Sequence, residues 1–372
     1  MHAIGFVRHH FLPPSETFIY TSLRALVDYK IRVLALRRDQ PAKFPFGDVT
    51  LLGRSSTLSV EALLYRAFAW SPRALRWART VKLIHAHTGN AGVHAAVMAR
   101  KAQLPLVVSY YGKDVTAPRA RARWNPSYWH YVIWQQWLFA AADRILVLSD
   151  DMRRALLEQG APADKLRTVP LGVDLSRFAV TRLPRTAEQP LRVLMVGREV
   201  EKKGFDDGLR ACAAARAQGA PLQVTVLGTG GPLRAELQRL ARTLALPVAW
   251  PSPDTSVPQA MAAHDVLLVP SRTAASGDRE GTPTVICEGA AAQLAVVATR
   301  HAGIPEQVEH ERTGLLVEER DVPAMAQQLH LLARHPELAR VLGKAGAAKM
   351  QAEYSVDAHA RRLSAVYREL LP

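Results

Sequence analysis

Two glutamates stand eight residues apart in the segment REGTPTVICEG (279–289), namely Glu280 and Glu288. Gly281, Thr282 and Pro283 follow the first of them and predict a helix start, with Thr282 as N-cap and Pro283 at the first helical position. Glu280 then precedes the helix, and Glu288 lies inside it, roughly 7.5 Å further along the axis. Two carboxyls that cleave a glycosidic bond with retention need to be only about 5 Å apart. The spacing therefore argues against a bond-flanking dyad.

The same segment is suited to holding one elongated ligand. Free backbone amides of Gly281 and Thr282 at a helix N-terminus would form an anion site, with one carboxylate on either side. A nucleotide sugar fits this layout, with its diphosphate at the amides and its ribose and sugar hydroxyls on the two carboxylates. On the residues alone, a plain helix cap at Glu280 and a solvated Glu288 remain an alternative.

The rest of the chain limits what kind of protein carries this segment. Its 372 residues exceed one ordinary core, so two domains are expected. With 48% hydrophobic and 22% charged residues, the composition is that of a folded protein. Cys212 and Cys287 are the only cysteines, which predicts no disulfide framework and a reducing cytoplasm. The start, MHAIGFVRHHFLPP, does not resemble a signal peptide, and no stretch reaches the about 18 apolar residues of a membrane span. A cytoplasmic protein is expected, either soluble or peripheral on the inner face of the membrane.

Short apolar runs alternate with helix-length segments, which predicts parallel strands in βαβ units. The aperiodic stretch between Gly172 and Pro190 indicates a linker. We therefore expect an α/β protein of two Rossmann-like, doubly wound domains, residues 1–180 and 190–353, facing each other across a cleft. Its strands are expected at 3–7, 31–36, 83–86, 105–109, 144–148 and 167–170, and at 191–196, 222–227, 265–269, 295–299 and 314–317.

Several motifs of the second half occur in the order of a known family. They are VGREVEKKGFDDGLRA, VTVLGTGGPLRAEL, HDVLLVPSRTAASGDREGTPTVICEGAAA, TRHAGIPEQV and TGLLV. The series resembles the retaining glycosyltransferases of family four, which have the GT-B architecture and a Glu-x7-Glu signature. It looks most like the bacterial exopolysaccharide enzymes of colanic acid type. PPSETFI, LIHAHTGNAG, VVSYYGKD and VPLGVDLSRF in the first half agree more loosely. The resemblance also implies that the C-terminal helix, 354–372, packs back on the first domain.

The resemblance assigns the donor site residue by residue. Arg198 and Lys203 match the basic pair that contacts the donor diphosphate. Glu280 matches the residue that holds donor-sugar hydroxyls, Glu288 the residue that bonds the ribose, and 281–283 the phosphate-facing helix start. Two cations there would neutralise the departing nucleoside diphosphate. Glu280, Arg198 and Lys203 are thus the expected catalytic residues, and neither a metal nor another cofactor is expected.

The first domain is expected to bind the acceptor. Tyr111 stands where many relatives carry a histidine near the donor sugar, and tyrosine is a poor proton acceptor near neutral pH. This fits better with a departing diphosphate that itself deprotonates the acceptor on the same face. A plain cap at 15–17 and a buried core histidine at 87 are the alternatives. The expected acceptor and cleft residues are Ser15, Glu16, Thr17, His87, Tyr111 and Asp114.

Positive charge is concentrated in the first half of the chain. Residues 1–180 hold 25 Lys and Arg against 12 Asp and Glu, whereas the remainder holds 23 against 21. The segments 63–82 and 117–139 combine arginines with six of the seven tryptophans, as interfacial elements do, although 124–137 is also compatible with core packing. The bias favours an anionic membrane surface and a polyprenyl-linked acceptor. Nucleic acid is not expected, because no recognition motif accompanies the charge.

These features together predict a retaining, metal-independent glycosyltransferase of hexosyltransferase type. It would move a sugar from a UDP- or GDP-sugar to a saccharide or lipid-linked acceptor in exopolysaccharide or cell-surface glycan synthesis. A nucleotide-sugar epimerase of the same fold and a non-catalytic sugar- or lipid-binding module are the alternatives. A dehydrogenase is disfavoured, because Leu233 replaces the third glycine of the fingerprint in GTGGPL.

Overall fold

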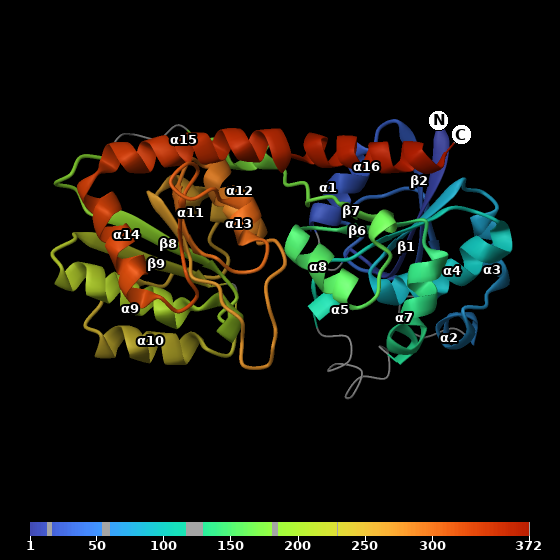
Figure 1. The fold of residues 1–372 in the computed structure, drawn as a ribbon, viewed down its shortest axis with the longest axis horizontal. Helices are drawn as coiled ribbons and strands as arrows, with labels where there is room; N and C mark the ends of the chain where they lie inside the picture. Colours follow the sequence, from blue (N-terminus) through green and yellow to red (C-terminus); the bar gives the residue numbers. More distant parts are fainter. Residues whose placement is uncertain (13–16, 54–59, 117–128, 181–184, 229, 372) are drawn as a thin grey trace. The chain divides into compact units, whose positions relative to one another are not determined.

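The computed structural model describes residues 1–12, 17–53, 60–116, 129–180, 185–228 and 230–371. They form two compact units, Met1–Gly172 with Val356–Pro372 and Val173–Ser355 (Figure 1). Each unit has its own fully parallel sheet. No helix among these residues is long and apolar enough to span a bilayer. Cys212 and Cys287 are both free and buried.

The sheet of the first unit has the strand order β3-β2-β1-β4-β5-β6-β7. Its central strands are apolar runs because helices cover both faces of a parallel sheet; all five residues of β4, for example, are buried. The strands are β1 (His2–Phe11), β2 (Tyr29–Arg38), β3 (Val49–Leu51), β4 (Leu83–His87), β5 (Leu106–Ser109), β6 (Arg144–Val147) and β7 (Leu166–Thr168).

Hydroxyl side chains start several helices of this unit. Ser71, Thr88 and Ser149 each accept a hydrogen bond from a backbone N–H of the first turn. The helices are α1 (Thr17–Ala25), α2 (Val60–Phe68), α3 (Pro72–Ala78), α4 (Gly89–Ala102), α5 (Lys113–Thr116), α7 (Trp129–Ala141), α8 (Asp150–Glu158), the short η2 (Ala163–Lys165) and α16 (Val356–Leu370).

The sheet of the second unit has the order β10-β9-β8-β11-β12-β13, which is the strand order of a Rossmann fold. Its strands are β8 (Leu191–Gly197), β9 (Leu222–Gly228), β10 (Val248–Ala249), β11 (Val266–Val269), β12 (Ala295–Thr299) and β13 (Leu315–Val317). The helices are η3 (Leu175–Phe178), η4 (Glu201–Lys203), α9 (Phe205–Ala217), α10 (Arg234–Thr243), α11 (Val257–Ala262), α12 (Thr284–Ala291), α13 (Ile304–Gln307), α14 (Val322–Arg334) and α15 (Pro336–Glu353).

Strand order reverses once in each sheet, between β1 and β4 and between β8 and β11. Open parallel sheets bind their ligands beyond the carboxyl ends of the strands at such a reversal, because the two following loops diverge there. The topology therefore singles out the loops after β1 and β4 in one unit and those after β8 and β11 in the other.

The unit boundary differs from the one expected at residue 180. Residues 173–180 belong to the second unit, because Val173, Leu175 and Phe178 pack into the hydrophobic cluster around α12. The C-terminal helix α16 belongs to the first unit, where it packs against α1 and where Glu369 pairs with Arg144 at 2.7 Å. Each of the eleven expected strand segments overlaps a strand, and β3 and β10 were not expected.

Candidate active site

The loop between β11 and α12 carries the first of the two glutamates. The Glu280 side chain is only 11% exposed, and its Oε1 lies 3.4 Å from the Nζ of Lys203 and 3.7 Å from the Nζ of Lys202. Both contacts are ion pairs, and among the described residues no group donates a hydrogen bond to this oxygen. Buried polar atoms without a partner are rare in folded proteins, so this oxygen suits a site that binds a ligand.

The two lysines have different surroundings. Lys202 is buried, and its Nζ contacts the carbonyl oxygen of Arg279 at 3.1 Å and the carboxylate of Asp278 at 3.4 Å. The stem of Lys203 lies over Gly197, the last residue of β8, which has φ 147°. Lys202 therefore anchors the Glu280 loop, whereas Lys203 presents its charge at the carboxyl end of β8. The sequence predicts a role for Lys203 and none for Lys202.

The helix that carries Glu288 begins later than expected. Helix α12 starts at Thr284, and Pro283 is its N-cap with ψ 115°, outside the helical range. The prediction of Thr282 as N-cap and Pro283 as first helical residue is therefore wrong. The Pro283 carbonyl accepts hydrogen bonds from the backbone N–H of Ile286 at 3.2 Å and from the side chain of Gln307 at 3.1 Å. The Thr282 hydroxyl is buried and has no hydrogen-bond partner among the described residues.

Glu288 is half-buried in α12. Burial is the largest influence and raises the pKa of its carboxyl, while Arg177, Thr284 and Lys203 act in the opposite direction. Lys203 thus acts on both glutamates. Lys203 pairs with Glu280 and also influences the charge of Glu288, so this cation links the two acids.

Arg198 and its neighbour Glu199 directly follow β8. Arg198 is exposed, whereas Glu199 is completely buried and pairs with Arg234 at 2.9 Å. Gly228 and Gly231 have no room for a side chain, because Glu199 fills the space where a Cβ would project. Here Gly228 and Gly231 of the GTGG loop serve close packing against Glu199.

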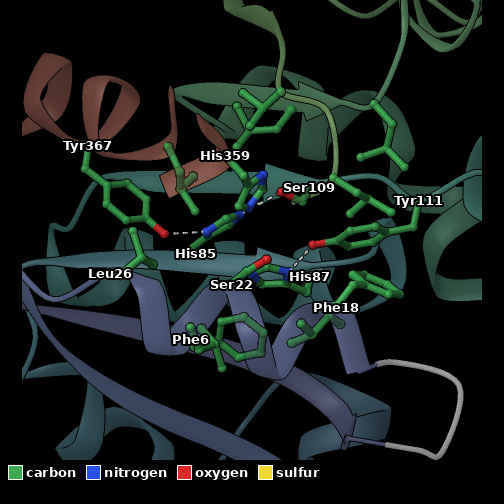
Figure 2. A pocket seen from close by; sticks show the side chains of 17 residues that line it. Phe6, Phe18, Ser22, Leu26, His85, His87, Ser109, Tyr111, His359 and Tyr367 are labelled. Carbon is green, nitrogen blue, oxygen red and sulfur yellow. Dashed lines mark hydrogen bonds between the residues drawn. The ribbon is translucent and has the colours of Figure 1, made fainter. Parts of the chain in front are cut away.

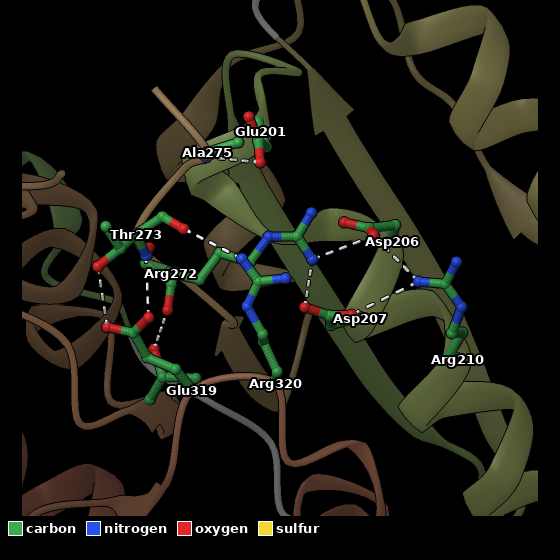
Figure 3. A network of polar contacts seen from close by, with 11 residues as sticks. Glu201, Asp206, Asp207, Arg210, Arg272, Thr273, Ala275, Glu319 and Arg320 are labelled. Atoms are coloured by element: carbon green, nitrogen blue, oxygen red, sulfur yellow. Dashed lines mark hydrogen bonds and ion pairs between the residues drawn. The ribbon is translucent and has the colours of Figure 1, made fainter. Parts of the chain in front are cut away.

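The Glu280 loop is held by residues from two other loops, part of which Figure 3 shows. Glu319, which follows β13, accepts from the backbone N–H of Thr273 at 2.9 Å and from Nδ1 of His301 at 2.6 Å. On its other side the His301 ring accepts from the backbone N–H of Glu280 at 3.0 Å. Nearby, Arg272 pairs with Asp206 at 3.1 Å and with Asp207. None of these contacts was predicted, because they join loops far apart in the sequence.

In the first unit, a pocket lies at the carboxyl ends of the central strands, lined also by α1 and α16 (Figure 2). His87 and Tyr111 are on its wall and hydrogen-bond to each other through Nδ1 and the phenol. The His87 ring stacks on Phe6 with centroids 3.8 Å apart, and its Nε2 is buried without a partner among the described residues. Burial, followed by His85 and Arg8, lowers the pKa of His87 well below its usual value, so the ring is neutral.

The other expected residues of the first unit have more limited outcomes. Asp114 is buried and accepts hydrogen bonds from the backbone N–H groups of Gly89 at 3.1 Å and Tyr111 at 3.0 Å, so it orders the loop after β5. Thr17 is the first residue of α1. Ser15 and Glu16 lie outside the described residues.

Comparisons with known proteins show the family of this chain. The family described as "Glycosyltransferase Family 4" matches residues 15–177, and that described as "Glycosyl transferases group 1" matches residues 190–335. The chain belongs to the family-four glycosyltransferases. The putative colanic acid biosynthesis glycosyltransferase WcaL of Escherichia coli is 29% identical to it, with 92% of this chain and 94% of WcaL aligned. The amylovoran biosynthesis glycosyltransferase AmsK of Erwinia amylovora is 32% identical over 63% of this chain and 58% of AmsK.

Solved structures identify the fold of this glycosyltransferase as GT-B. Anabaena HepE in complex with UDP and glucose superposes with a TM-score of 0.76 at 18% identity, over the full length of both chains. The lipopolysaccharide outer core galactosyltransferase WaaB gives 0.75 at 14% identity over 99% of this chain and all of WaaB. Within the described ranges, no cluster of three or more His, Cys, Asp and Glu side chains could hold a metal ion.

Proposed function

We propose that this glycosyltransferase transfers a sugar with retention, and without a metal ion, from a UDP- or GDP-sugar to a saccharide or lipid-linked acceptor in bacterial cell-surface polysaccharide synthesis. The observation that carries the proposal is the cluster of Glu280, Lys203 and Glu288 at the β8/β11 reversal. Oε1 of Glu280 and the Thr282 hydroxyl, both buried and without a hydrogen-bond partner among the described residues, lie in the same loop. Relatives named for colanic acid and amylovoran synthesis support the pathway class, and HepE with UDP and glucose supports the donor class.

Each residue of the cluster would act on one part of the donor. Lys203 and Arg198 would bind the diphosphate, which competes with the carboxylate of Glu280 for the lysine. Glu280 would then accept hydrogen bonds from sugar hydroxyls, and Glu288 from ribose hydroxyls. Lys203 and Arg198 would carry positive charge where the diphosphate gains negative charge, which lowers the barrier to its departure.

The transfer itself exchanges one bond for another at the anomeric carbon. The bond from this carbon to the diphosphate oxygen breaks, and its electron pair leaves with the nucleoside diphosphate. An acceptor hydroxyl bonds to the anomeric carbon on the same face, which preserves the configuration. Its proton passes to the departing phosphate oxygen, so no protein base is required. Neutral His87 and Tyr111 would bind hydroxyl groups in the first unit.

The test combines purified protein, a panel of UDP- and GDP-sugars, and membrane or oligosaccharide fractions, with release of nucleoside diphosphate as the readout. We expect release to require one donor and an acceptor fraction and to persist in EDTA. Glu280→Gln and Lys203→Met should each lower turnover by about 10²–10³-fold, as loss of one charge-stabilising group does. Glu318→Gln is the matched control, because Glu318 is 71% exposed.

Retained turnover in both site variants would refute the site assignment. Loss of turnover in EDTA would refute metal independence. Interconversion of the donor sugar without any acceptor would indicate an epimerase, and donor binding without turnover under all conditions a binding module.

An exposed aromatic surface of the first unit supports peripheral binding to an anionic membrane. Helix α7 exposes Trp129, Ile133 and Trp134 by 54%, 71% and 49%, while Gln135 is buried. The N-terminus of α7 adjoins the C-terminus of α2, where Phe68 is 72% exposed. Exposed arginines of α2, of α3 and directly after α3, at positions 66, 73, 76 and 79, would meet acidic headgroups.

A further inference from the structure

The Glu280 loop, between β11 and α12, is held by a hydrogen bond near each end, and both hydrogen bonds lead to the side chain of Glu319. No helix or strand lies between β11 and α12. At its start, the backbone N–H of Thr273 donates to Oε2 of Glu319 at 2.9 Å. At its end, the backbone N–H of Glu280 donates to Nε2 of His301 at 3.0 Å, and Nδ1 of His301 lies 2.6 Å from Oε1 of Glu319. Glu319 therefore holds Thr273 directly and Glu280 through the imidazole (Figure 3 shows the Thr273 side of this tie).

The direction of each hydrogen bond in this chain is fixed. A backbone N–H can only donate, so Nε2 of His301 must accept from Glu280. Nδ1 must then carry the proton and donate to Glu319, which makes the ring neutral and fixes its tautomer. His301 is completely buried, and no water-facing alternative is open to it. Although burial, the largest influence, raises the pKa of Glu319, its bonds from Thr273 and His301 lower it overall, so the acceptor stays ionised.

These ties differ from the contacts of the two lysines. Lys202 and Lys203 approach the Glu280 carboxylate itself, so a donor diphosphate competes for them. His301 and Glu319 instead hold the Glu280 backbone, and the structure shows no bond from either to the carboxylate. The hydrogen bonds that His301 and Glu319 make to the loop would therefore remain when the Glu280 carboxylate loses its lysine contacts and binds the ligand.

We propose that His301 and Glu319 are positioning residues, which place the Glu280 carboxylate for the sugar part of the donor. The proposal rests on the proposed function, since it takes Glu280 as the group that holds donor-sugar hydroxyls. It assigns to the two residues no contact with the diphosphate.

Glu319→Gln is the most discriminating substitution, because it preserves shape and removes one acceptor. If the amide oxygen faces His301, the amide NH₂ confronts the N–H of Thr273. If the amide oxygen faces Thr273, the amide NH₂ lies against the protonated Nδ1 of His301. The ring can then accept from the NH₂ only if its proton moves to Nε2, where it would lie against the N–H of Glu280. Every arrangement sets one donor against another. His301→Ala removes the tie, whereas His301→Gln keeps one donor and one acceptor.

The experiment measures affinity by calorimetry for the pairs UDP and UDP-glucose, and GDP and GDP-mannose. The gain, defined as the factor by which the sugar nucleotide binds more tightly than the bare nucleotide, reports the contact of the sugar with Glu280. We expect Glu319→Gln and His301→Ala to reduce this gain about tenfold, as loss of one hydrogen bond to a charged group does, with the affinity for the bare nucleotide unchanged. His301→Gln should recover part of it, and the exposed neighbour variant Glu318→Gln should keep all of it.

A second readout does not depend on any ligand. Amide hydrogen exchange at Glu280 should be faster in Glu319→Gln and His301→Ala than in the wild type, and unchanged in Glu318→Gln. If Glu319→Gln keeps the affinity gain of the wild type, and its amide exchange at Glu280 is as slow as in the wild type, the positioning role is overturned. If Glu280→Ala keeps the gain, or if the wild type shows none, the proposed function of Glu280 fails, whatever the other variants do.

Discussion

Acidification is expected to destabilise the first unit through a buried histidine. Burial, followed by the charge of His359, lowers the pKa of His85 to about 3. Its Nδ1 bonds to the phenol of Tyr367 at 2.7 Å and its Nε2 to the hydroxyl of Ser109 at 2.8 Å. In the unfolded chain the pKa is about 6.5. Between these two values the unfolded chain binds more protons, so the free energy of unfolding decreases as the pH falls. From pH 7 to pH 5 this one group removes about 2 kcal/mol.

Tryptophan fluorescence provides the assay, because six of the seven tryptophans precede residue 173 and report on the first unit. Urea unfolding curves at pH 7, 6 and 5 give the pH dependence for the wild type and for His85→Asn. The variant loses packing and is less stable at pH 7, but its stability should fall by about 2 kcal/mol less on going to pH 5. His335→Asn is the control, since His335 is 53% exposed. Parallel pH dependences of His85→Asn and the wild type would refute the reasoning.

Two further outcomes follow from buried charge and exposed apolar surface. Arg234→Met should lower the free energy of unfolding of the second unit by about 3 kcal/mol, because it leaves Glu199 buried without its partner. Amide hydrogen exchange of β8 and β9 measures this loss. Arg239→Met, on the exposed side of α10, is the control, and equal effects of the two substitutions would contradict the prediction. In a co-sedimentation assay, vesicles with phosphatidylglycerol should bind the protein more tightly than vesicles of phosphatidylcholine alone. The double substitution Ile133→Ser with Trp134→Ser should lower the affinity for the vesicles about tenfold or more, because two large side chains are no longer buried in the lipid. Val341→Ser, at an exposed apolar position of the second unit, should change nothing, and equal binding to both vesicle types would count against an anionic membrane partner.

The sequence predicts the fold of this chain well because its strands are buried on both faces. β4, β11 and β12 consist of continuous buried residues, and such runs are visible without knowledge of their neighbours. β3 and β10 were missed because they have only three and two residues and lie at the sheet edges, where half of their surroundings are absent. The end of the first domain was misplaced because 173–180 carries no periodic pattern. Only its packing against α12 assigns it to the second unit.

Some residues of the candidate site can be recognised from their spacing in the sequence, and others only from their contacts in the folded structure. Glu280 and Glu288 are recognisable because their distance along the chain and the helix between them are local properties. The start of α12 is less easily predicted, because the segment before it also makes remote contacts: the carbonyl of its N-cap, Pro283, accepts a hydrogen bond from Gln307, more than twenty residues later. His301 and Glu319 are more remote still, because each is an ordinary loop residue until the sheet sets the loops after β11, β12 and β13 side by side. The sequence therefore predicts groups that touch a ligand more readily than groups that hold them in place, because the former depend on residue type and spacing and the latter on the order of the strands.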